Sequence, residues 1–353
     1  MIEGKHVIVT GGTGSLGKVL VKRLLSGAEG MPASVTVFSR DEAKQDQFRE
    51  ELTGSGAATD EVMYRSALER VRFRIGSVTD RSAFSAALRG AQIVFHAAAL
   101  KQVPSCEYHP VEAVRTNVDG AAMLVDIIRS ERLPVEVVVG VSTDKACLPV
   151  NVMGMTKALQ ERVLVEANLH SEGTRYVMAR YGNVLASRGS VIPLFHQQIN
   201  AGGPLTITTS DMTRFFMSLE QAVDTLLEAC RHASPGEIVI PRVPSALVVD
   251  VATTLIGDRS IDVREIGIRP GEKVHETLVS EEEAARTHQS GDYLRIAPML
   301  PQLTTTSSGP SWDGGAYTSA TDLLDLDGVR ALLERHLLRI DDRPFGAAHE
   351  VTR

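Results

Sequence analysis

The sequence predicts an α/β fold built on a doubly wound parallel sheet. Short apolar runs, typical of strands that are buried on both faces, alternate with helical stretches through the first half of the chain. A glycine-rich turn links the first of these runs to the first helical stretch. This alternation of strand and helix implies right-handed crossovers and therefore a parallel sheet.

The first strand–turn–helix unit predicts a dinucleotide site of the Rossmann type. The apolar run 6–10 leads into glycines at positions 11, 14 and 17. Glycines allow close approach of the backbone to a pyrophosphate, and the next helix offers free N–H groups and a positive dipole end to the phosphates. The loop residues expected to bind the cofactor are Gly11, Thr13, Gly14, Ser15, Leu16 and Gly17.

The end of the second predicted strand, 34–38, bears on which dinucleotide is bound. NAD sites usually carry a carboxylate directly at this strand end, for the ribose hydroxyls. Here Ser39 and Arg40 come first, ahead of Asp41 and Glu42. The fork of an arginine matches a phosphate dianion, so the sequence favours NADP over NAD. In the alternative interpretation, Arg40 is a surface residue paired with Asp41 or Glu42.

Two more strands, over 71–75 and 92–96, and a long helix over 111–130 complete the first half. The alanines after the fourth strand would let the backbone pass close to the cofactor. His96, at a strand end among these alanines, is expected to be packed and hydrogen-bonded and not catalytic. The residues of this region expected at the cofactor are Ser77, Val78, Ala97, Ala98, Ala99 and Asn117.

The segment Ser142-Thr143-Asp144-Lys145 is the main candidate for chemistry. It follows a buried run over 135–141, and ligands of open α/β sheets lie at the carboxyl ends of strands. Met153 and Lys157 lie four residues apart in the helix predicted over 152–167, so they share one face. In the alternative interpretation, the segment is a helix-capping cluster followed by a solvated lysine.

Composition excludes several classes of function. The 353 residues carry a formal net charge of −7, which repels nucleic acid and anionic membrane surfaces. The sequence shows no signal peptide, no apolar run of the roughly 20 residues that a membrane span needs, and three scattered cysteines without metal or disulfide spacing. We expect a cytoplasmic protein without a metal, and an anionic substrate would need a local basic pocket.

Several long motifs, in one order, resemble the extended short-chain dehydrogenase/reductase superfamily. They are Thr10–Gly17, Phe38–Glu42, His96–Pro110, Ser142–Lys145, Arg180–Pro193, Asp211–Phe215 and Arg269–Lys273. More narrowly, the chain resembles the inverting UDP-N-acetylglucosamine 4,6-dehydratases of capsule and O-antigen biosynthesis. It is most similar to the N-acetyl-L-fucosamine branch, which carries Met in place of the catalytic Tyr, and Met153 fits that pattern.

The resemblance implies a mechanism with NADP recycled in each cycle. Asp144 would be the acid at the C6 hydroxyl and Lys145 the base at C5, and the product would be UDP-2-acetamido-2,6-dideoxy-β-L-arabino-hex-4-ulose. Burial is expected to keep Asp144 protonated and Lys145 neutral. Thr143 would bond the C4 oxygen, and Lys157 would orient the nicotinamide ribose. Met153 has no proton to give, so Thr143, Lys157 or water would replace the tyrosine relay; core packing is the alternative role of Met153.

The resemblance also implies a substrate-binding set. Arg269 and Arg214 suit the pyrophosphate of a UDP-sugar, and Glu272 suits the ribose hydroxyls; Lys101 and Arg214 have structural ion pairing as an alternative role. The residues expected at the substrate are Lys101, Asn183, Val191, Ile192, Pro193, Thr206, Arg214, Arg269 and Glu272, and Tyr181 and Asn183 are expected at the cofactor. One departure is Ser77, which stands where relatives carry the aspartate that holds the adenine amino group.

The resemblance further implies a smaller, interleaved α/β substrate-binding domain. Its segments would be 187–214 and 243–298, and the cofactor domain would comprise 1–186 with a return segment at 215–242. The extension 299–353 would end in an amphipathic helix over 323–338. We expect this extension either to reach a neighbouring subunit of a homo-oligomer (dimer to hexamer) through Trp312 and Tyr317, or to be disordered.

Two other functions remain open. A UDP-sugar 4-epimerase would share the fold but needs no Asp–Lys pair, so Asp144 and Lys145 argue against it. A non-catalytic NADP-sensing protein would explain the missing tyrosine, but the retained Lys157 and the segment 269–273 argue against that. UDP-glucose or another donor is an alternative substrate, and epimerisation at C3 is left open.

Overall fold

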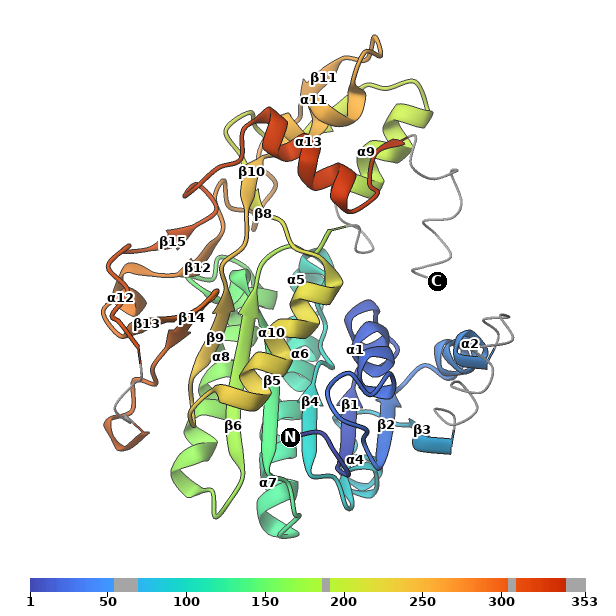
Figure 1. Cartoon of the computed structure of the whole chain (residues 1–353), viewed down its shortest axis with the longest axis vertical. Helices are drawn as coiled ribbons and strands as arrows, with labels where there is room; N and C mark the ends of the chain where they lie inside the picture. The colour runs from blue at the N-terminus through green and yellow to red at the C-terminus, as the bar shows by residue number, and fades with distance from the viewer. Residues whose placement is uncertain (54–68, 186–190, 304–308, 341–353) are drawn as a thin grey trace.

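The computed structural model describes residues 1–53, 69–185, 191–303 and 309–340. Within these residues, one central sheet has the strand order β13-β14-β9-β6-β5-β4-β1-β2-β3 (Figure 1). Its parallel strands are β1 (His6–Thr10), β2 (Ser34–Ser39), β3 (Val71–Ile75), β4 (Ile93–His96), β5 (Val137–Thr143), β6 (Arg175–Tyr181) and β9 (Ile238–Pro241). The strand order reverses direction between β1 and β4, which is where open α/β sheets bind ligands.

Helices cover both faces of this sheet and create two separate cores. On strand β1, Val7 and Val9 belong to one core and Ile8 to the other, because successive side chains of a strand point to opposite faces. The first core adds helices α1 (Ser15–Leu25), α2 (Glu42–Thr53) and α10 (Leu219–His232). The second adds α4 (Arg81–Leu88), α7 (Gly120–Ser130) and α8 (Val152–Ala167). The predicted doubly wound sheet is confirmed.

The helix predicted over 111–130 is continuous, but it contains a π-helical turn that the sequence did not predict. It begins as α6 (Pro110–Ala113), passes through the π turn (Val114–Asp119) and continues as α7, and the separate short helix α5 (Val103–Tyr108) precedes it. The π turn carries Asn117, which is fully buried. Its amide accepts from Leu100 N at 2.8 Å and donates to Leu100 O at 3.0 Å and to Thr156 Oγ1 at 2.9 Å. The turn therefore places an amide between the loop after β4 and helix α8.

The antiparallel edge of the sheet departs from the predicted domain boundaries. Strands β14 (Tyr293–Ile296) and β13 (Thr287–Ser290), expected in the substrate domain, extend the central sheet beyond β9. Leu294 and Ile296 are fully buried, so one face of β14 belongs to the core of this sheet. The open hydrogen-bonding edge of β9 explains the addition, because an unpaired edge is costly.

A second lobe lies at one end of the sheet, at the top of Figure 1. It contains helices α9 (Val191–Asn200), α11 (Val248–Ile256) and α13 (Leu326–Arg335) and the short strands β7 (Leu205–Ile207), β8 (Thr213–Phe215), β10 (Ser245–Leu247) and β11 (Val263–Glu265). Phe195, Leu255 and Leu333 share one apolar core there. Helix α13 thus belongs to the lobe of its own chain.

A second described part of the C-terminal extension, around strand β15, also packs on its own chain. Strand β15 (Tyr317–Thr318) pairs with β12 (Thr277–Val279), and the short helix α12 (Glu281–Ala284) follows β12. Tyr317 is buried, and its hydroxyl donates to Val243 O at 3.0 Å. Trp312 packs edge-on against it with ring centroids 6.3 Å apart. Tyr317 is therefore a core residue, which corrects its expected role as an anchor on a neighbouring subunit.

Parts of the predicted second half, at 187–190, 304–308 and 341–353, lie outside the described residues. No helix in the described part of the chain is long and apolar enough to cross a membrane.

Candidate active site

Strand β5 ends at Thr143, and a single 3-10 turn then carries Asp144 and Lys145. Thr143 Oγ1 donates to Asp144 Oδ1 at 2.8 Å, and Lys145 Nζ donates to the same oxygen at 3.0 Å. The Thr143 side chain also caps the turn by accepting from Lys145 N at 3.4 Å. The capping and chemical interpretations of this segment are therefore compatible.

Lys145 lies between two buried carboxylates. Its Nζ is 3.0 Å from Asp144 Oδ1 and 3.3 Å from Glu276 Oε1. Burial alone would lower the pKa of Lys145, but the charges of Asp144 and Glu276 outweigh burial and raise it. The expectation that burial keeps Lys145 neutral is wrong, because it did not include the second carboxylate.

Glu276 is the main site residue that sequence reasoning missed. It lies three positions after the motif Arg269–Lys273 and is only 3% exposed. Arg214 Nε lies 4.0 Å from Glu276 Oε1. The sequence signal was the acidic residue just beyond a matched motif, but only the fold brings it to Lys145.

Lys157 ties helix α8 to strand β5. Its Nζ donates to Val141 O at 2.6 Å and to Gln160 Oε1 at 2.5 Å. Burial lowers the pKa of Lys157 to about 8, against the opposing charge of Glu161. An amine with this pKa can exchange a proton near neutral pH.

Met153 lies on the same helix, one turn earlier. It is 4% exposed and packs in a small apolar cluster with Cys106 and Ala113, bordered by Leu100 and Val103. These contacts agree with the core-packing role that the sequence left open for Met153.

A buried ionic network holds the end of β5 from behind. Ser142 Oγ donates to Glu161 Oε1 at 2.5 Å, and Arg180 bonds Glu161 and Glu283 together. Burial alone would raise the pKa of Glu283, but hydrogen bonds and charge from Arg180 lower it to about 2. The network joins β6, α8 and α12 beside strand β5, which leads into Asp144.

The glycine loop has the shape of a phosphate cradle. Gly11 has φ +67°, and a Cβ there would lie 2.9 Å from Ala97 O, while a Cβ on Gly17 would lie 2.6 Å from Gly12 Cα. Helix α1 has Gly14 as its N-cap, with no capping side chain among the described residues. Its first N–H groups are therefore available for a pyrophosphate. The loop fits a dinucleotide, with Thr13, Ser15 and Leu16 in the same turn.

Arg40 lies exposed just after β2, and no hydrogen bond or ion pair joins it to another described residue. Asp41 instead pairs with Lys44 at 2.8 Å. The alternative in which Arg40 pairs with a neighbouring carboxylate is therefore not found. Gln45 Nε2 holds Ser39 by donating to its hydroxyl at 3.0 Å.

The remaining residues expected at the cofactor divide into two groups. Ala97, Ala98 and Ala99 follow β4 and are partly buried, and the Ser77 hydroxyl, beside buried Val78, bonds the Thr79 hydroxyl at 2.7 Å. The second group is buried. The amide of Asn117 forms its hydrogen bonds with Leu100 and Thr156, and Tyr181 is 8% exposed. Asn117 therefore braces the loop after β4, which corrects its expected contact with the cofactor.

His96 at the end of β4 is packed, as predicted. Its Nδ1 bonds Thr10 Oγ1 at 3.1 Å, and its ring stacks on Phe84. Burial and the charge of Lys157 lower the pKa of His96 to about 3. The ring is therefore neutral.

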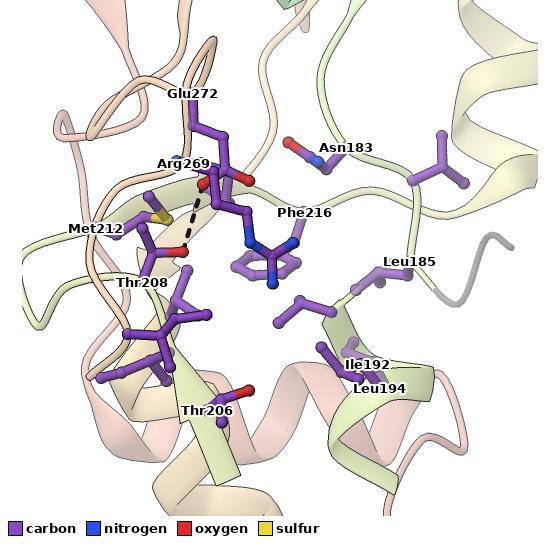
Figure 2. Close-up of a pocket in the computed structure, with 16 residues that line it drawn as sticks. Asn183, Leu185, Ile192, Leu194, Thr206, Thr208, Met212, Phe216, Arg269 and Glu272 are labelled. Atoms are coloured by element: carbon purple, nitrogen blue, oxygen red, sulfur yellow. Dashed lines mark hydrogen bonds between the residues drawn. The ribbon is translucent and has the colours of Figure 1, made fainter. Parts of the chain in front are cut away.

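A cavity of about 180 Å³ lies in the second lobe (Figure 2). Arg269 and Phe216 both line it, and Thr208 Oγ1 donates to Glu272 Oε2 at 3.5 Å. The residues predicted at the substrate that line this cavity are Asn183, Val191, Ile192, Thr206, Arg214, Arg269 and Glu272. Lys101 and Pro193 are exposed and are not among the lining residues.

A chain of charged side chains connects the cavity with the end of β5. Arg214 lines the cavity and lies 4.0 Å from Glu276, which contacts Lys145. The sequence did not predict the apolar wall made by Phe216, Met212 and Leu194. Among the described residues, no group of three His, Cys, Asp or Glu side chains is arranged to hold a metal ion.

Residues 7–298 match the model of the polysaccharide biosynthesis protein family. The chain belongs to this family. The family lies within the extended short-chain dehydrogenase/reductase superfamily, so the predicted superfamily is confirmed.

The chain is similar to several nucleotide-sugar enzymes and solved structures. A UDP-glucose 4-epimerase of Rickettsia conorii is 42% identical over 301 residues, covering 84% of each chain. The X-ray structure of Pen from Bacillus thuringiensis is 32% identical with a TM-score of 0.84, covering 96% of this chain and 99% of that one. The dTDP-glucose 4,6-dehydratase DesIV of Streptomyces venezuelae, solved with NAD bound, shares the fold at 22% identity and a TM-score of 0.63, covering 76% and 86%.

Proposed function

We propose that this family member is an NADP-dependent UDP-N-acetylglucosamine 4,6-dehydratase that inverts C5. The observation that carries the proposal is the Asp144–Lys145 pair at the end of β5, joined through Glu276 and Arg214 to a cavity with cations. Dehydration needs an acid and a base beside one sugar, and this pair supplies both groups from adjacent positions.

NADP, held by the residues of the glycine loop, would supply the hydride chemistry at C4 and C6. The chain supplies the proton transfers. Thr143 bonds the C4 oxygen, Lys145 removes the C5 proton, and Asp144 gives a proton to the departing C6 hydroxyl. Return of a proton to the opposite face of C5 gives the L-configured 4-keto sugar.

The cavity suits the nucleotide half of the substrate. Arg269 and Arg214 supply positive charge for a diphosphate, within a chain whose net charge is −7. Glu272 offers acceptors to ribose hydroxyls, and the ring of Phe216 offers an apolar face to the base. Arg40, without a partner among the described residues, favours the 2′-phosphate of NADP.

The test is incubation with UDP-N-acetylglucosamine in D₂O, followed by NMR. A 6-deoxy-4-keto product with deuterium at C5 is the expected result. Lys145→Ala and Asp144→Asn should stop its formation while NADP stays bound. Lys22→Ala, at a half-exposed site on α1, is the matched control and should retain activity. Normal turnover by Lys145→Ala would contradict the mechanism.

A second candidate is a UDP-sugar 4-epimerase, favoured by the relatives named UDP-glucose 4-epimerase at 42% identity. The same experiment separates the two functions. An epimerase would give UDP-N-acetylgalactosamine, or UDP-galactose from UDP-glucose, without loss of the C6 oxygen. Bound cofactor without any turnover would instead indicate a sensor.

A further inference from the structure

Glu276 is a third charged residue beside the Asp144–Lys145 pair on which the proposed function rests. Glu276 Oε1 lies 3.3 Å from Lys145 Nζ, and the Glu276 side chain is 4% exposed. Asp144 lies on the other side of the same ammonium at 3.0 Å and is 1% exposed. One cation is therefore shared by two carboxylates that are withdrawn from water.

Each of these carboxylates keeps one oxygen with no hydrogen-bond partner among the described residues. The two oxygens are Asp144 Oδ2 and Glu276 Oε2. Buried polar atoms are nearly always paired, and exceptions are frequent where a group must accept a proton or a ligand. Both carboxylates thus have spare proton-accepting capacity next to Lys145.

The backbone at Glu276 is firmly held. Glu276 N donates to Ser319 Oγ at 2.9 Å, and Ser319 Oγ bonds Thr213 Oγ1 at 2.7 Å. Ser319 belongs to the C-terminal extension and is fully buried. The extension therefore fixes the carboxylate that faces Lys145.

Two further cations face this cluster. Arg214 Nε lies 4.0 Å from Glu276 Oε1, and its Nη1 donates to Thr213 O and Val274 O. Lys273 donates to Cys147 O at 2.6 Å and acts on Lys145 through its charge. The charged groups around Lys145 are thus Asp144, Glu276, Arg214 and Lys273.

A base at C5 must be a neutral amine, yet its two carboxylate partners stabilise the ammonium form of Lys145. The proton therefore needs a local acceptor before the chemical step. Asp144 must hold a proton of its own to act as the acid at C6, which leaves Glu276 as the acceptor.

We propose that Glu276 is a positioning residue that takes the proton of the Lys145 ammonium and so frees the amine to act as base. The proton passes from Nζ to Oε1, which leaves a neutral amine and a neutral carboxylic acid. The amine then takes the C5 proton, and a proton from the resulting ammonium is later delivered to the opposite face of C5. Finally Glu276 returns its proton to Lys145, so the pair ends as it began. The base role rests on the proposed function.

The pH profile distinguishes this role from a structural one. Proton transfer between Lys145 and Glu276 exchanges no proton with solvent, so the wild-type kcat should stay constant around neutral pH. In Glu276→Gln the ammonium must lose its proton to solvent. Its rate should rise about tenfold per pH unit until Lys145 is neutral.

The first experiment compares Glu276→Gln, Glu276→Asp and the surface control Glu282→Gln. At about pH 7 the Gln variant should lose about 100-fold in kcat with KM within about twofold, and should recover as pH rises. The Asp variant should recover part of the rate, and the control should match wild type. Unchanged kcat in Glu276→Gln, or a loss equal at every pH, would overturn the inference.

A second experiment needs no turnover. Brief acetylation with acetic anhydride over a pH series, read by peptide mass spectrometry, gives the midpoint at which Lys145 becomes neutral. Glu276→Gln should lower that midpoint by about one pH unit or more, with exposed Lys44 as the internal reference. An unchanged midpoint would refute the pairing. Absence of dehydration by wild type would refute only the proposed function, because the midpoint shift is measured independently.

Discussion

Arg180 and Glu161 form an ion pair inside the protein, with Nη2 2.7 Å from Oε2 and the side chains 1% and 2% exposed. Arg180 Nη1 also lies 2.7 Å from Glu283 Oε2. One guanidinium therefore joins β6, α8 and α12 beside strand β5, which leads into Asp144. The proposed catalytic segment is thus supported by a buried cation that is not among the residues lining the cavity.

Removal of that charge should be costly. Arg180→Met removes the ion pair of buried Glu161 and leaves Glu283 only the longer pair with Arg286 at 3.7 Å, and should lower the free energy of unfolding by about 3–5 kcal/mol. Urea denaturation is the measurement. Arg129→Met, at a site 61% exposed, is the control and should change it by less than about 0.5 kcal/mol. A loss in Arg180→Met no larger than in the control would contradict the role given to the network.

Acid should weaken the same network through Glu283. The pKa of Glu283 is about 2 in the folded protein, against an ordinary value of 4.5. Between these values the unfolded chain binds more protons, so stability is complete above about pH 4.5 and falls as pH drops toward 2. The full loss is about 3 kcal/mol.

Urea unfolding of wild type and Glu283→Gln between about pH 5 and 3 checks this dependence. The Gln variant should be less stable at the upper pH and should lose less stability on acidification. Glu282→Gln, one residue earlier and exposed, should retain the wild-type slope. Equal slopes in wild type and Glu283→Gln would contradict the lowered pKa.

Arg40 should set the choice of dinucleotide. Arg40→Ser removes the cation expected at the 2′-phosphate and should weaken NADP binding about tenfold or more, with NAD binding within about twofold. Calorimetric titration with both dinucleotides measures the change. Arg89→Ser is the control. Arg89 is also an exposed arginine, but it lies at the C-terminal end of helix α4, and its replacement should leave both affinities unchanged. Equal losses for NADP and NAD would exclude recognition of the 2′-phosphate by Arg40.

Met153 should behave as a packing residue. Met153→Leu conserves volume and should cost less than about 1.5 kcal/mol, with kcat within about twofold of wild type. Met153→Tyr restores the residue usual in the superfamily but overfills the cluster around Cys106 and Ala113, and should cost about 1–3 kcal/mol. Product formation and urea denaturation of both variants check this. A large loss of kcat in a stable Met153→Leu would give the thioether a direct role.

Elements with a strong local signal were predicted well from the sequence. Helix α8 has the predicted bounds, 152–167, because Asn151 caps its first turn by accepting from Gly154 N. Strands β1 and β3 also have their predicted bounds. The π turn within the helix over 111–130 was not predictable, because its residue Asn117 bonds Leu100 and Thr156, which are distant in sequence.

At the candidate site too, residues within sequence motifs were predicted, whereas properties that depend on distant neighbours were not. Motif residues such as Arg269 and Glu272 were expected at the substrate by resemblance, and both line the cavity of the second lobe. The charge state of Lys145 was mispredicted because burial was weighed without Glu276. A pKa depends on the sum of burial and all nearby charges, and sequence order alone does not show which charges become neighbours.

Helix α13 has a consequence for how the chain matures during synthesis. Its residues Val329, Leu332 and Leu333 complete the core of the second lobe, although they come near the end of the chain. A ribosome releases strands β1 to β6 long before it releases this helix, and N-terminal units fold first. We expect the glycine loop of a nascent chain to form while the cavity of the second lobe is still incomplete, so premature termination would leave a folded sheet without a finished second lobe.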